Sequence, residues 1–373
     1  MSDFIPVNEP LLSGNEKKYL AECIDTGWIS SEGPFVKRLE KDFSARVGRK
    51  HGIAVANGSV ALDLAIAALC IGQGDEVILP SFTIISCAAA IVRAGATPVV
   101  VDCDPQNWNM DLEQVKAKIT KHTKAVMAVH IYGLCVDMDA LLAITEPLGI
   151  AVIEDAAQAH GQTVRGRPCG SFGAISSFSF YPNKHITTGE GGMVMVDDDA
   201  LAARCESLRN LCFQPEKRFV HEELGWNFRM SNLQAAVGCA QLERLDEFTR
   251  IKREMGRRYS ELLAGVKSIE QPLAKTDSAE NIYWVYGLVL ADDVPFDAKE
   301  VMAKLAKLGI GTRPFFWGMH EQPVFKKMGL FKDENLPVTQ RLARRGFYIP
   351  SGMALTAAQA ERVATAVKEV LKS

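Results

Sequence analysis

The chain has 373 residues, 47% of them hydrophobic, which is enough for a full hydrophobic core and favours a large domain joined to a smaller one. Its formal net charge of −3 gives no reason to expect a nucleic-acid or anionic-membrane partner. No run approaches the ~18 apolar residues that span a bilayer, and residues 1–6 lack the pattern of a secretion signal, so we expect a cytoplasmic protein.

Short β-rich runs alternate with helical stretches between about residues 50 and 197. This pattern predicts a mostly parallel sheet that is covered by helices on both faces, with functional residues where the strands end. The expected strands cover residues 76–80, 97–102, 124–130, 150–155, 174–180 and 192–196. The expected helices cover residues 59–71, 84–94, 112–118 and 138–148.

Residues 232–266 contain few helix breakers and predict one long or kinked helix that leaves the main domain. We therefore expect a large domain over residues 1–245 and a small α+β domain over residues 246–373. The small domain should contain strands at 283–290 and 311–315 and helices at 298–308 and 357–371. We expect residues 1–30 to pack on the small domain or on a partner subunit.

A lysine and an acid carry the main functional signal. Asp155 ends an apolar run, and Lys184 follows 29 residues later, before a glycine-rich turn at 187–192. A lysine can form a Schiff base with the aldehyde of pyridoxal phosphate (PLP), while a carboxylate keeps the pyridine nitrogen protonated. A desolvated amine also loses basicity, which suits this chemistry near neutral pH. Taken alone, Asp155 is equally well explained as a helix cap or a structural ion pair.

Three further positions fit a phosphorylated cofactor. The N–H groups of Gly58 and Ser59 precede a predicted helix and could hold a phosphate, although a Gly-Ser pair is also a common helix cap. The hydroxyl of Ser179, five residues before Lys184, could bind the same phosphate. Gln158 is a candidate partner for the phenolic oxygen of the cofactor, whereas His160 is more simply explained as a histidine near the core.

The nine cysteines are odd in number, scattered, and contain no C-x-x-C pair. This distribution predicts reduced thiols, several of them in the core, rather than disulfides or a metal site. We expect no metal.

Together these residues resemble the DegT/DnrJ/EryC1/StrS family of PLP-dependent sugar aminotransferases. The matching stretches follow one another along nearly the whole chain, at residues 26–31, 57–59, 74–81, 95–98, 129–133, 153–157, 177–180, 184–192, 225–232 and 311–314. The resemblance implies an α/β protein of PLP-dependent transferase fold type I, like aspartate aminotransferase. Such a protein has a large, mostly parallel sheet domain and a small C-terminal α+β domain.

The resemblance also implies roles for the matched positions. Lys184 would form the Schiff base with PLP, and Asp155 would pair with the pyridine nitrogen. Asn227 would reach the phosphate of the neighbouring subunit's cofactor, which implies an obligate homodimer with shared active sites. The phosphate in the chain's own site would be held by Gly58, Ser59 and Ser179. Lys184 further separates transaminases from their dehydratase relatives, which carry histidine at this position.

Residues 28–31, 187–193 and 311–314 are most similar to family members that move an amino group from L-glutamate to C4 of GDP-4-keto-6-deoxymannose for surface polysaccharide synthesis. The implied reaction is ping-pong, with pyridoxamine phosphate as the intermediate form of the cofactor. Arginine forks match carboxylates and diphosphates, although surface ion pairs explain such residues equally well. The candidate substrate-binding residues are Trp28, Ser30, Arg229, Arg313 and His320.

One position departs from the family pattern. Relatives often place an aromatic residue after Pro-Ser-x-Thr to stack on the cofactor ring, and this chain has Ile84 there. Either Ile84 covers the ring as an aliphatic face, or Phe82 shifts to do so.

Two other functional classes stay open. One is an aminotransferase or dehydratase that acts on a UDP- or dTDP-linked keto sugar. The other is a non-catalytic sensor or regulator that keeps the fold and the cofactor, although no DNA-binding helix pair or basic patch supports it.

Overall fold

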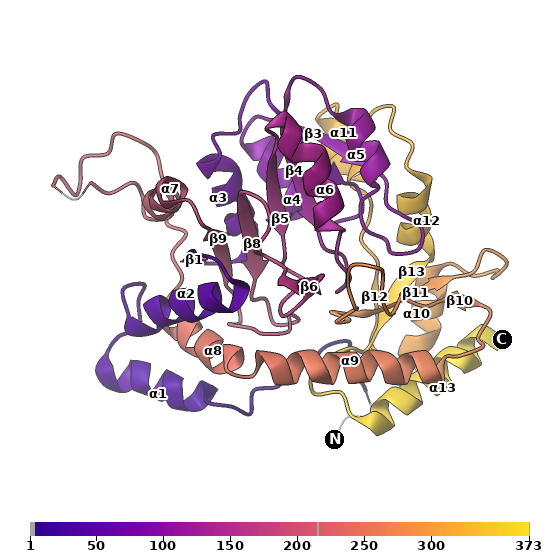
Figure 1. Ribbon diagram of the computed structural model, residues 1–373. Coiled ribbons are helices and arrows are strands. Elements are labelled where there is room, and N and C mark those ends of the chain that lie inside the picture. The colour runs from indigo at the N-terminus through magenta and orange to yellow at the C-terminus, as the bar shows by residue number, and fades with distance from the viewer. Residues whose placement is uncertain (1–3, 215, 373) are drawn as a thin grey trace.

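A seven-stranded sheet forms the centre of the large domain in the computed structural model, which describes residues 4–214 and 216–372 (Figure 1). The strand order is β1-β9-β8-β5-β4-β2-β3. The strands are β1 (His51–Val55), β2 (Glu76–Pro80), β3 (Thr97–Val101), β4 (Thr123–Val129), β5 (Ala151–Asp155), β8 (Ile175–Ser179) and β9 (Gly192–Val196). Neighbours from β8 to β3 pair in parallel, whereas β9 runs antiparallel to both β8 and β1. The predicted fold class is therefore confirmed.

All six predicted strands are present, two with the predicted ends and the others with ends that differ by one residue. Edge strand β1 was missed by the sequence analysis. Its sequence, His-Gly-Ile-Ala-Val, contains glycine and alanine, which are depleted in strands, and only its last three residues are buried. The hydrophobic run is therefore too short to stand out.

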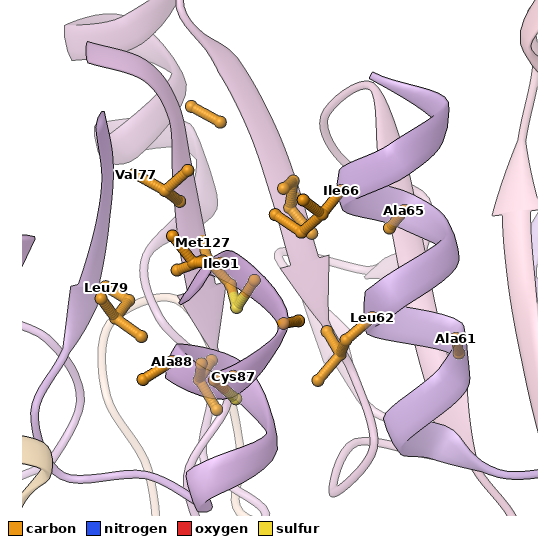
Figure 2. Packing of buried hydrophobic residues seen from close by; sticks show 14 of the residues in the cluster. Ala61, Leu62, Ala65, Ile66, Val77, Leu79, Cys87, Ala88, Ile91 and Met127 are labelled. Atoms are coloured by element: carbon orange, nitrogen blue, oxygen red, sulfur yellow. The ribbon is translucent and has the colours of Figure 1, made fainter. Parts of the chain in front are cut away.

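Helices cover both faces of this sheet because alternate strand residues point to opposite sides. Val77 and Leu79 of β2 lie in one core with α3 (Gly58–Ala68), α4 (Ile85–Arg93) and α7 (Asp199–Arg209). Ile78 lies in the other core with α2 (Pro34–Val47), α5 (Leu112–Lys118), α6 (Met138–Thr145) and α8 (Asn232–Leu242). Figure 2 shows the first core, where side chains of α3 and α4 gather around those of the strands.

The predicted long helix is present in two pieces, α8 and α9 (Leu245–Leu262), which are separated at residues 243–244. Helices α1 (Glu16–Thr26), α2 and α7 were not predicted. The predicted helix at 138–148 ends earlier, at Thr145, and continues as a 3₁₀ turn over Glu146–Leu148. Pro147 has no N–H to continue the α-helical ladder, which accounts for the change.

The C-terminal part contains a second sheet in the order β10-β11-β13-β12, antiparallel throughout. Its strands are β10 (Ile269–Glu270), β11 (Tyr286–Leu290), β12 (Arg313–Pro314) and β13 (Gly346–Ile349), and its main helices are α10 (Ala298–Lys307), α12 (Pro337–Arg345) and α13 (Ala357–Lys372). Helix α9 crosses from the large sheet to this smaller one (Figure 1). The proposed domain boundary at 245/246 falls at the first turn of α9.

The N-terminal segment contacts the small sheet's elements. The Ile5 N–H donates to Gly309 O at 2.8 Å, Gly311 N–H donates to Ile5 O at 2.8 Å, and Ser351 N–H donates to Val7 O at 2.9 Å. Residues 5–7 therefore attach the N-terminal segment to the small domain before α1 packs against α8. Within residues 4–214 and 216–372, none of the helices has the length and apolar character needed to cross a bilayer.

Candidate active site

A cavity of about 760 Å³ lies where the large and small sheets approach each other. The carboxyl ends of β5 and β8 contribute Asp155 and Ser179, and the first turn of α3 contributes Gly58 and Ser59. Ligands commonly bind at the carboxyl ends of parallel strands in such sheets. Lys184, from the loop after β8, lines the same cavity. The structure therefore brings together residues that the sequence separates by more than a hundred positions.

Lys184 is half-buried, and desolvation lowers the pKa of its amine to about 7, against the attraction of Asp155. Near neutral pH a large fraction of this lysine is therefore the neutral, nucleophilic amine. Its Nζ lies 3.8 Å from the centroid of the Trp284 ring.

Asp155 is 3% exposed, and burial raises the pKa of its carboxyl group. One carboxylate oxygen accepts the Ala157 N–H at 3.0 Å and the other accepts the Cys87 thiol at 3.2 Å. A buried carboxyl group with so few donors is suited to receive one further cationic partner. A protonated pyridine nitrogen is such a partner.

The first turn of α3 forms a cradle for an anion. Asn57 caps the helix by accepting the Val60 N–H at 3.0 Å, so the earlier N–H groups of Gly58 and Ser59 stay available at the positive helix end. A Cβ on Gly58 would lie 2.5 Å from Ser179 Cβ, so only glycine fits here. The Ser59 hydroxyl lies 2.7 Å from that of Ser86, which also lines the cavity and was not predicted.

The positions of Ile84 and Phe82 show which of the two can cover the ring of a bound cofactor. Ile84 is 41% exposed and lines the cavity. Phe82 is fully buried and packs against Tyr132, Phe315 and Phe316 instead of lining it. The geometry therefore favours Ile84 as the side chain that covers a bound ring. Gln158 also lines the cavity, although its Oε1 already accepts the Tyr132 N–H at 2.7 Å.

The small domain supplies an aromatic wall that the sequence analysis missed. Trp284, Phe316 and Tyr348 line the cavity opposite the large-domain residues. The Tyr132 ring packs against two of these residues, with its centroid 5.8 Å from that of Trp284 and 5.4 Å from that of Phe316. These three residues come from separate segments of the small domain, so no local sequence signal predicts that they meet at one cavity.

The remaining predicted residues do not line the cavity of this chain. Trp28, Ser30 and Asn227 are exposed, Arg229 bonds Asn210, and Arg313 donates to Thr312 O at 2.9 Å. His320 is 2% exposed, and its two ring nitrogens face the Ser81 hydroxyl at 2.7 Å and the Gln340 amide at 3.2 Å. Internal hydrogen bonds thus account for His320, and its substrate role stays a prediction without support from this chain's cavity. The substrate-binding roles of Trp28, Ser30, Arg229 and Arg313 likewise stay predictions without support from this cavity.

His160 is buried among the rings of Phe43, Phe178 and Phe180, as expected for a core histidine. Neither of its ring nitrogens has a hydrogen-bond partner among the described residues, and burial lowers its pKa to about 3. This histidine is therefore a neutral part of the packing behind the site.

All nine cysteines are free thiols, as predicted. Eight are buried, and Cys70 is exposed. Cys135 and Cys169 lie with their Sγ atoms 3.0 Å apart beside His130, whose Nε2 is 2.9 Å from Glu154. Nothing in their spacing along the sequence predicts this cluster.

Comparison with known proteins identifies the class that this fold and site define. The model of the DegT/DnrJ/EryC1/StrS aminotransferase family matches residues 10–368, and the chain belongs to this family. It is 42% identical to GDP-perosamine synthase of Caulobacter vibrioides, over 100% of both chains, and 40% identical to GDP-perosamine synthase of Vibrio cholerae, over 98% of both chains. Among solved structures, it is similar to S. venezuelae DesV in complex with a ketimine intermediate (33% identity, TM-score 0.89, 96% and 95% of the two chains).

The protein is therefore a sugar aminotransferase of a PLP-dependent family. The matches favour neither of the alternative classes, the dehydratase and the non-catalytic sensor. The described site fits the family cofactor for three reasons. Gly58 leaves room for an anion at the start of α3, the buried Asp155 carboxyl group has few hydrogen-bond donors, and Lys184 has a lowered pKa.

Proposed function

We propose that this protein transfers an amino group from L-glutamate to GDP-4-keto-6-deoxymannose and forms GDP-perosamine, with PLP as its cofactor. One observation carries the chemistry: Lys184 and Asp155 face one cavity at the N-terminus of α3. The choice of a GDP-linked sugar rests on relatives that bear this name and match the chain along its full length.

When it is bound, PLP supplies an electron sink that stabilises negative charge at the carbon that carries the amino group. Lys184 does the proton chemistry. With a pKa of about 7, its Nζ would move a proton from the α-carbon of the amino donor to the cofactor in the first half of the reaction, and from the cofactor to the sugar carbon in the second half. A lysine of ordinary pKa would stay protonated at neutral pH and would be a poor base.

The other residues bind and orient. Asp155 would hold the pyridine nitrogen in its protonated form through a charge-assisted hydrogen bond in a buried environment. Gly58, Ser59 and Ser179 would hold the phosphate, assisted by the positive end of α3. Trp284, Phe316 and Tyr348 would exclude water from the opposite side.

We also propose that two chains complete each site. Asn227 is exposed and absent from the lining of its own chain's cavity, so its predicted role toward a phosphate requires a neighbouring subunit. A neighbouring subunit would cover apolar side chains that are exposed in the single chain. They include Trp28, Ile29, Phe219, Leu224 and Trp226. A cytoplasmic location and a role in surface polysaccharide (O-antigen) synthesis belong to the same proposal.

The test is a substrate screen with the purified, PLP-reconstituted protein. GDP-4-keto-6-deoxymannose and the corresponding UDP- and dTDP-linked 4-keto sugars would each be incubated with L-glutamate. We expect an amino sugar from the GDP substrate, identified by mass and NMR, together with an equal amount of 2-oxoglutarate. Lys184→Ala is the negative control. Turnover of a UDP- or dTDP-linked sugar alone would contradict the substrate proposal, and sugar conversion without 2-oxoglutarate would contradict the transaminase mechanism.

A further inference from the structure

Trp284 covers the reactive nitrogen of Lys184. The Lys184 Nζ lies 3.8 Å from the centroid of the Trp284 ring, and both residues line the cavity. The face of a tryptophan ring carries partial negative charge and attracts an ammonium group, more strongly in a desolvated site. The ring therefore opposes the effect of burial, which disfavours the charged form of the lysine.

Trp284 is held in place at both its side chain and its main chain. Its indole N–H donates to Asn183 O at 2.7 Å, so the ring is tied to the residue that precedes Lys184. Its own carbonyl oxygen accepts a hydrogen bond from Lys252 Nζ at 2.8 Å. Trp284 is 3% exposed, and its ring packs against Tyr132 and Tyr348, with centroids 5.8 and 6.4 Å away.

Lys252 has no evident use in packing. It lies in α9, is 2% exposed, and donates only to the main-chain oxygens of Trp284 and Ser351. Among the described residues it forms no ion pair with a carboxylate, and desolvation alone lowers its pKa to about 7. Burying a lysine without a carboxylate is costly, so its two hydrogen bonds call for a structural explanation. They fix the segment that carries Trp284 to the helix that joins the two domains.

We propose that Trp284 and Lys252 are positioning residues: the Trp284 ring holds the Lys184 amine whenever that amine is free, and Lys252 anchors the ring through the Trp284 carbonyl. The inference rests on the proposed role of Lys184. In this proposal the small domain helps to set the position and the pKa of the Lys184 amine. Within the large domain, only burial and Asp155 would act on that amine.

Other charges face Lys184 and set the background for the test. The Asp155 carboxylate raises its pKa, whereas Cys87, whose own pKa is raised by burial, and His160 are uncharged. Lys252 would repel the lysine if the two charges interacted directly. Removing Lys252 would then raise the pKa of Lys184, whereas loss of the anchored ring would lower it. The sign of the change therefore separates the two explanations.

The measurement is the pKa of Lys184 in the full chain freed of bound aldehyde with hydroxylamine. Trace acetylation at a series of pH values, with the peptide of Lys184 quantified by mass spectrometry, gives this pKa without PLP or substrate. We expect Trp284→Leu to lower it by about 0.5 to 1.5 units. Trp284→Phe, which keeps a weaker ring, should give a smaller decrease. Lys252→Met should lower it too, and adding Lys252→Met to Trp284→Leu should cause no further change.

Phe296→Leu is the matched control, because the Phe296 ring lies 3.4 Å from Lys304 Nζ, outside the cavity lining. It should leave the pKa of Lys184 unchanged. An unchanged or raised pKa in Trp284→Leu would overturn the role of the ring. A raised pKa in Lys252→Met, or an additive effect in the double variant, would overturn the anchoring role. Since no outcome depends on turnover, failure of the proposed substrate would leave this test intact.

Discussion

Gly58 and Ser179 touch where the first turn of α3 meets the end of β8, so closely that a Cβ on Gly58 would lie 2.5 Å from Ser179 Cβ. The contact places two N–H groups of α3 beside the Ser179 hydroxyl. A phosphate needs this kind of convergence of donors at a positive helix end. If this cradle holds the cofactor phosphate as proposed, the closeness of the two segments serves binding as well as packing.

Gly58→Ala should weaken PLP binding by about tenfold or more, because the new methyl group must displace Ser179 and the helix end. The measurement is the dissociation constant of PLP from its visible absorbance. Gly72→Ala is the control, since a Cβ there meets its nearest neighbour at an ordinary 3.6 Å. Equal PLP affinity in Gly58→Ala and the wild type would show that the phosphate is held elsewhere.

Asp155→Asn should retain the shape of the site but lose its negative charge, and an amide cannot hold a pyridine nitrogen in its protonated form. Loss of one charge-assisted hydrogen bond predicts a decrease of about 10- to 100-fold in kcat with PLP bound. Cys87→Ser keeps a donor to the same carboxylate and should change kcat little. Rates of Asp155→Asn within twofold of the wild type would exclude the assigned role.

Lys252 should make the protein more stable as the pH rises above about 7. Its folded pKa of about 7 lies below the unfolded value, so the unfolded chain binds more protons between pH 7 and about 10. The free energy of unfolding should rise by about 1 kcal/mol per pH unit from this group, and the cost of its charge is fully present below pH 7. Urea unfolding at pH 7.5, 8.5 and 9.5 gives the free energy of unfolding at each pH. This free energy should rise less steeply with pH in Lys252→Met than in the wild type. An equal rise in the two proteins would contradict the lowered pKa.

Sites shared between subunits predict complementation. In a shared site, Lys184 would come from one chain and Asn227 from the other. A dimer of one Lys184→Ala chain and one Asn227→Ala chain therefore contains one intact site and one doubly altered site. If both single variants are inactive, unfolding and refolding an equal mixture should restore about a quarter of wild-type activity. Asn227 lying outside its own chain's cavity is the observation behind this prediction. No restored activity from a mixture that forms dimers would contradict a shared site.

The sequence predicted the parts of the molecule that local chemistry determines. Lys184, Asp155, Gly58 and Ser59 could be placed because the lysine loop, the strand end and the helix start each carry a local pattern, and the structure brings them to one cavity. Trp284 could not be placed, since its role depends on how the small domain meets the large one.

Strand β1 and His320 also show where prediction from local sequence fails. Strand β1 lacked a hydrophobic run and is recognisable only through its pairing with β9. His320 was a candidate substrate-binding residue, but its ring nitrogens face Ser81 and Gln340 within the chain. Pairing partners and internal hydrogen bonds come from distant residues, and no local pattern announces them.

The central claim is that Lys184 bonds covalently to PLP. The direct test is borohydride reduction of the reconstituted wild-type protein, followed by peptide mass spectrometry and by repetition with Lys184→Ala. We predict one cofactor-modified peptide, containing Lys184, and none in the variant. A modification on a different lysine, or a wild-type protein that binds PLP without any reducible bond, would contradict the account.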